Sequence, residues 1–186
     1  MTPPTDEQAI AATQRWLERA VIGLNLCPFA KAVAVKRQIR WVVSSAQSEA
    51  GLTRVLSAEL NFLAAADPRE VDTTLIIHPL VLQDFRDYND YLAIAESMVA
   101  QLELEGVLQV ASFHPGYQFA GSGPEDIENY TNRSPYPTLH LLREESVTRA
   151  VEAFPDAAGI YETNMDTLRR LGHAGWKRLW TDDSSG

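Results

Sequence analysis

The sequence has little cysteine and no cluster of basic residues. Cys27 is the only cysteine in 186 residues, which excludes an intramolecular disulfide and a metal site built from several thiolates. The formal net charge is −9, and no run of Lys or Arg is present. Nucleic acids and anionic membranes both require clustered cations, so we expect neither as a partner. A small anionic molecule is the favoured partner, and a protein partner is the alternative.

Long hydrophobic runs and familiar catalytic motifs are also missing. No apolar stretch approaches the ~20 residues of a membrane-spanning helix, and no secretory leader is visible. With a single cysteine, these features predict a cytoplasmic protein. The glycine-rich phosphate-binding patterns, GxSxG and HExxH do not occur, which argues against dinucleotide-binding proteins, nucleophile-elbow hydrolases and zincins.

The spacing of apolar residues predicts alternating helices and strands. Strands are expected at 39–44, 73–79, 107–115 and 138–143, where β-branched and aromatic residues are concentrated. Helical spacing is found at 5–24, 47–66, 85–102, 144–154 and 163–172. We therefore expect a single α/β domain over 1–180 with a flexible tail at 181–186.

The sheet is expected to be four-stranded, mixed and mostly parallel, with flanking helices. The strand order stays open, although sequential strands are usually neighbours, and the fourth strand is expected to be antiparallel at an edge. Thr5 with Gln8 predicts a capping box for the first helix, and Thr163 with Asp166 a capping pair for the last. Gly172 is expected to end the last helix.

Two predicted strands end on His-Pro, at His78 and His114. In an α/β sheet, ligands bind beyond the carboxyl ends of parallel strands, so adjacent strands would bring both imidazoles to one crevice. There the histidines could act as acid and base or hold a divalent metal such as zinc. The alternative is structural, because strand-end histidines often bond a nearby carbonyl.

Cys27 in "NLCPF" follows a predicted helix and has basic residues close in sequence. It is a candidate nucleophile or metal ligand. A small buried hydrophobic side chain is the alternative, since free cysteines are among the most buried residues. His140, inside an apolar strand, is expected to be a satisfied core or edge histidine rather than a catalytic one.

The segment 116–136 is long, rich in Gly, Ser, Asn and Tyr, and lacks helical or strand periodicity. A loop of this length inside a compact domain is usually functional or disordered, and its aromatic content argues against disorder. An arginine among hydroxyl and amide groups is suited to orient an anion, although the same residues are common in turns. The candidate substrate-binding residues are Arg133, Asn132, Thr131, Ser134 and Tyr117.

Several motifs together resemble a bacterial family catalogued as domain of unknown function 1415. They are "GLNLCPFA", "IIHP", "FHPGYQF", "NYTNRSPYPTLHLLRE" and "YETNMDTLRRLG", and they extend over nearly the whole chain. The resemblance implies a single full-length domain. It implies no activity, cofactor or catalytic residue, so every candidate site above depends on the residues alone.

The sequence favours a small cytoplasmic enzyme that acts on an anionic small molecule. His78 or His114 would be the general acid or base, Cys27 a nucleophile or ligand, and Arg133 the anion clamp. The alternative is a non-catalytic module that binds a ligand or protein through the same crevice and the aromatic 116–136 loop. A third interpretation places Trp176 and Trp180, with the tyrosines of that loop, in a protein-binding surface.

Overall fold

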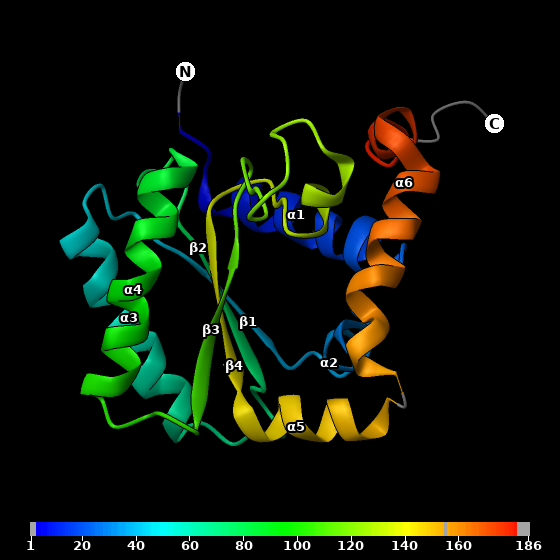
Figure 1. Ribbon diagram of the computed structural model, residues 1–186. Coiled ribbons are helices and arrows are strands. Elements are labelled where there is room, and N and C mark those ends of the chain that lie inside the picture. Colours follow the sequence, from blue (N-terminus) through cyan, green and yellow to red (C-terminus); the bar gives the residue numbers. More distant parts are fainter. Residues whose placement is uncertain (1–2, 155, 182–186) are drawn as a thin grey trace.

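A mixed four-stranded sheet forms the centre of the computed structural model, which describes residues 3–154 and 156–181 (Figure 1). The strands are β1 (Ile39–Val43), β2 (Thr73–Ile77), β3 (Leu108–Phe113) and β4 (Thr138–Arg143), in the order β1-β2-β4-β3. β1 is parallel to β2, and β4 is antiparallel to both of its neighbours. The predicted α/β class and mixed four-stranded sheet are confirmed, although only one of the three strand pairs is parallel, so the pairing is not mostly parallel as expected.

The strand order, which the sequence left open, separates the second and third strands, because β4 lies between them. Thr138 is opposite Ile77 on one side and Phe113 on the other. β4 is therefore central rather than at an edge, which suits a strand whose residues are buried on both faces of the sheet. β1, β2 and β3 still run in the same direction, so their carboxyl ends meet at one end of the sheet.

One face of the sheet is covered by α3 (Glu49–Ala65) and α4 (Phe85–Gln101) (Figure 1). Both helices begin at capped residues: Ser48 accepts from the amide of Gly51, and Asp84 accepts from the amides of Arg86 and Asp87. The main core lies here, and its fully buried members include Leu52, Leu56, Leu60, Leu63, Ile76, Tyr88, Ala95, Leu139 and Leu141.

A second apolar cluster lies on the opposite face of the sheet. It is built from α1 (Asp6–Trp16), the π-helical segment Leu17–Ile22 that continues it, and α6 (Ile160–Arg178). The predicted capping box of Thr5 and Gln8 is confirmed. The short α2 (Ala30–Val35) was not predicted, since it has only six residues and buries none of them. α5 (Glu144–Ala153) lies at the end of the sheet away from the 116–136 loop (Figure 1).

The last helix is longer than its pattern predicted. Thr163 and Asp166 lie inside α6, so the predicted capping pair is wrong. Gly172 does not end the helix but bends it, with φ 63° and ψ 173°, a conformation open mainly to glycine. The bend redirects the final turns, which contain Trp176. Of the expected tail, residues 182–186 lie outside the described residues, and no described helix is long and apolar enough to cross a membrane.

Candidate functional site

His78 and His114 lie at the carboxyl ends of β2 and β3, as predicted. The amide of His78 donates to the carbonyl of Pro137 at 2.9 Å, and the amide of His114 donates to the carbonyl of Asn132 at 3.1 Å. His78 therefore extends the pairing of β2 with β4 by one residue, whereas His114 bonds farther back in the loop that precedes β4. The following proline then turns the chain out of the sheet.

The two imidazoles share Tyr88 of α4 as a neighbour. The ring centroid of Tyr88 is 5.7 Å from that of His78 and 4.9 Å from that of His114. The histidines are thus no farther apart than the sum of these distances, although their strands are not adjacent. They are, however, only 0% and 2% exposed, so they form part of the core beneath the loops.

Hydrogen bonds determine which nitrogen of each ring carries the proton. Nδ1 of His114 accepts from the amide of Gly116 at 2.9 Å, so its Nε2–H donates to the carbonyl of Leu82 at 3.1 Å. Nδ1–H of His78 donates to the carbonyl of Val81 at 3.0 Å. Both nitrogens of His114 are therefore used within the fold. Nε2 of His78 is buried and has no partner among the described residues.

Burial keeps both imidazoles neutral. Desolvation lowers the pKa of His78 to about 4, and it also lowers the pKa of His114. A neutral imidazole could in principle bind a metal. Among the described residues, however, no three His, Cys, Asp or Glu side chains are grouped so that they could hold one.

Cys27 is not brought to the histidines. Its partly buried side chain packs against the cluster on the α1 and α6 face, whereas Tyr88, the shared neighbour of the histidines, belongs to the core on the α3 and α4 face. The predicted combination of Cys27 with His78 and His114 therefore lacks the geometry of one shared site.

His140 projects from β4 on the same face as Cys27. Its Nε2–H donates to Thr73 Oγ1 at 2.7 Å, because the only proton of that hydroxyl is donated to the carbonyl of Leu141 at 2.6 Å. Desolvation lowers the pKa of His140 to about 4. One nitrogen of this histidine is satisfied within the sheet, in line with the expected structural role.

The 116–136 segment is folded by its own hydrogen bonds. Asn129, which is fully buried, accepts from the amide of Phe119 and the hydroxyl of Ser122, and its Nδ2 donates to the carbonyl of Gly123. Sequence reasoning missed this role, although Asn is a residue whose side chain commonly bonds loop backbone. The loop is therefore a fixed wall rather than a free flap.

Arg133 is held by the same loop. Its Nε donates to the carbonyl of Tyr117 at 3.1 Å, and Nη2 donates to the carbonyl of Pro124 at 2.6 Å. The guanidinium also lies 4.5 Å from the ring centroid of Tyr130. These contacts use much of the donor capacity that an anion clamp would need, so Arg133 organises the loop as well as contributing charge.

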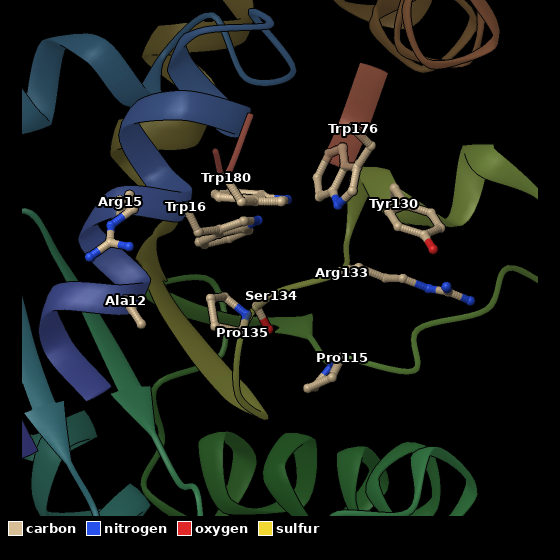
Figure 2. A pocket seen from close by; sticks show the side chains of 10 residues that line it. All are labelled: Ala12, Arg15, Trp16, Pro115, Tyr130, Arg133, Ser134, Pro135, Trp176 and Trp180. Carbon is tan, nitrogen blue, oxygen red and sulfur yellow. The ribbon is translucent and has the colours of Figure 1, made fainter. Parts of the chain in front are cut away.

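A pocket of about 440 Å³ opens between α1, this loop and the last turns of α6; we call it the tryptophan pocket (Figure 2). Of the predicted binding residues, Arg133 and Ser134 line it, whereas Thr131, Asn132 and Tyr117 are not in its lining. The full lining is Ala12, Arg15, Trp16, Pro115, Tyr130, Arg133, Ser134, Pro135, Trp176 and Trp180.

Several polar groups of this pocket have no partner within the described protein. Nε1 of Trp16 is buried without a hydrogen bond, and its side chain is only 2% exposed. The guanidinium of Arg15 and the indole N–H of Trp180 make no hydrogen bond or ion pair with a described residue. Sequence reasoning missed Arg15 and Trp16, because a helical stripe alone does not distinguish a pocket wall from core.

Comparisons with known proteins give one result. A family model described as "Protein of unknown function (DUF1415)" matches residues 8–178. Searches of curated proteins and of solved structures find no match.

Proposed function

The chain belongs to the DUF1415 family, and we propose that it binds an anionic small molecule in the tryptophan pocket without transforming it. The observation that carries this proposal is the composition of the pocket wall. It combines three indole rings and a phenol with two guanidinium groups, and it contains no carboxylate.

The size and chemistry of the pocket support a small organic ligand. Small-molecule sites typically have volumes of roughly 300–1,000 Å³ and mainly apolar walls with a few polar groups, and the value of about 440 Å³ lies within this range. The rings are also fixed in place, because Trp176 makes edge contacts with Tyr130 at 5.0 Å and with Trp180 at 5.5 Å between centroids. A preformed wall of this kind lowers the entropic cost of binding.

The charge of the pocket supports an anion. The whole chain has a formal net charge of −9, so a cavity lined by Arg15 and Arg133 without an acidic side chain differs sharply from the average surface. A cation would be repelled by both guanidinium groups. An anion would gain a partner for Arg15, which has none among the described residues.

The wall favours binding over turnover. It contains no His, Cys, Lys, Asp or Glu, and the hydroxyl of Ser134 donates to the carbonyl of Tyr136 at 2.6 Å. A general base that works near neutral pH is therefore missing from this lining. The enzyme hypothesis would need His78 or His114, and both are buried outside the lining.

A second hollow, of about 650 Å³, borders the start of α4, but its chemistry is less favourable. Its lining carries Asp84 and Asp87 against a single arginine, Arg86. Asp84 is already engaged as the N-cap of α4. The acidic balance makes this hollow a poor site for an anion.

A thermal-shift screen of organic anions, each paired with its neutral analogue, tests the proposal. Ligands that bind the native state raise Tm in proportion to their affinity. We expect anionic hits whose affinity falls severalfold in Arg15→Gln and is unchanged in Arg54→Gln, a variant of an exposed arginine on α3. Hits that bind wild type and Arg15→Gln equally well would contradict anion binding in this pocket.

A further inference from the structure

We infer that the ligand is a monocarboxylate with an aromatic or apolar body, and that the indole N–H groups of Trp16, Trp176 and Trp180 bind its carboxylate. This inference rests on the proposed function and specifies the chemical class of the ligand. Indole N–H is a donor only, so three such groups around one space select an acceptor.

Trp16 provides the strongest evidence. Its ring is fixed by an edge contact with Phe113 at 5.0 Å between centroids, and the residue is 2% exposed. Buried polar groups in native proteins nearly always have a hydrogen-bond partner, yet Nε1 of Trp16 has none among the described residues. Because Trp16 lines the pocket, we assign the missing acceptor to a ligand bound there.

The other two indoles are arranged around the same space. Figure 2 shows the nitrogens of Trp16 and Trp180 at the ring ends that point toward Trp176, whose nitrogen points into the pocket. Neither Trp176 nor Trp180 donates its indole N–H to a described residue. The bend at Gly172 directs the last turns of α6, which carry Trp176, and Trp180 follows directly after the helix ends at Arg178. This segment therefore supplies two of the three donors.

The balance of charge favours a carboxylate over a phosphate. Arg133 already donates to two loop carbonyls, which leaves Arg15 as the cation of the lining without a partner in the described protein. One such guanidinium matches a single negative charge. A phosphate dianion is more strongly hydrated, and neutral donors in an apolar wall would not replace that hydration.

The remaining walls favour an apolar or aromatic body. Pro115, Pro135 and Ala12 contribute apolar surface, and the faces of the aromatic rings add more. Planar aromatic groups gain from stacked or edge contacts with such rings. A carboxylate held by the indoles would therefore leave its apolar body against this surface.

Isothermal titration calorimetry with three probes tests the inference: 4-phenylbenzoate, its neutral amide, and inorganic phosphate. Wild-type protein is expected to bind the acid about tenfold or more tightly than the amide, since hydrogen bonds to charged groups are the stronger ones. Phosphate is expected to bind more weakly than the acid.

Tryptophan variants test whether the indole N–H groups cause the preference for the acid over the amide. Trp16→Phe and Trp180→Phe each retain an aromatic ring but lose the N–H. Each should lower the affinity for the acid about tenfold and the affinity for the amide much less. Trp180 is half-buried, so its variant retains the test if Trp16→Phe fails to fold. Trp41→Phe is the matched control, since Trp41 lies on β1 outside the lining.

The outcomes separate the two proposals. Equal affinity for acid and amide, with both weakened by Trp180→Phe, would overturn carboxylate recognition and the preference for an anion, and would leave only ligand binding in the pocket. Tighter binding of phosphate than of the acid would overturn the inference of a carboxylate ligand but not the proposal of anion binding. Absence of binding by all three probes would contradict both proposals.

Discussion

Acidification is expected to destabilise the fold through His78 before the carboxyl groups titrate. The pKa of His78 is about 4 in the folded protein because of burial, against 6.5 for an unperturbed histidine. Above pH 6.5 both states are neutral. Between pH 6.5 and 4 the unfolded chain binds a proton that the folded protein does not, so the free energy of unfolding decreases as the pH falls.

The magnitude follows from these two pKa values. Each pH unit inside the window costs about 1.4 kcal/mol per histidine, which amounts to about 2 kcal/mol for His78 at pH 5. His140 has a pKa of about 4 for the same reason and adds a loss of the same sign. Domains are commonly stable by roughly 5–15 kcal/mol, so the combined effect is measurable. Asp67, whose pKa its neighbour Arg69 lowers to about 2, acts only below this window.

Urea denaturation at pH 7.5, 6 and 5 provides the assay, with His78→Asn and His140→Gln beside wild type. An asparagine amide can replace Nδ1–H of His78 as donor to Val81, and a glutamine amide can replace Nε2–H of His140 as donor to Thr73; neither titrates. Each variant should show a pH slope shallower by about 1.4 kcal/mol per unit between pH 5 and 6. Identical slopes in all three proteins would refute neutral burial of these histidines.

Three further predictions concern the structure around the pocket. Tyr88→Phe removes a hydroxyl that donates to the carbonyl of Thr138 and accepts from the amide of Phe113, so urea denaturation should show a loss of about 1–3 kcal/mol without a change in ligand affinity; unchanged stability would contradict this role. Asn129→Ala leaves buried loop groups unpaired, and hydrogen exchange should increase across 116–136, whereas native protection would argue against it. Gly172→Ala meets no steric clash but must adopt φ 63°, which should cost about 1–3 kcal/mol and weaken ligand binding by displacing Trp176; full affinity would show that the bend does not position that ring.

Local patterns predicted the elements well, because capping and periodicity depend on neighbouring residues. The sequence shows the N-terminal capping box, the four strands and the helices α3 and α4. The position of β4 in the sheet was not predicted, because it depends on strand pairing across the long loop between β3 and β4. That strand separates β2 from β3, so His78 and His114 do not lie on adjacent strands. Their rings instead share Tyr88 as a neighbour.

The candidate site was predicted only in part, for a similar reason. Arg133 and Ser134 were identified from the composition of their loop, and Trp176 and Trp180 were noted as a candidate protein surface. Their meeting with Trp16 requires the continuation of α6 past Gly172, and no local signal indicated that continuation. The His-Pro pairs gave the strand ends correctly but could not reveal that loops would bury both rings.

Side-chain NMR of the indole N–H groups tests the central claim most directly. The chain has four tryptophans, so a ¹H–¹⁵N spectrum gives four indole signals that single Trp→Phe variants can assign. On titration with 4-phenylbenzoate, the signals of Trp16, Trp176 and Trp180 should shift together and saturate at one affinity, while that of Trp41 stays in place. Shifts confined to Trp41, or no shift in the three pocket signals at saturating ligand, would contradict anion binding by the tryptophan pocket.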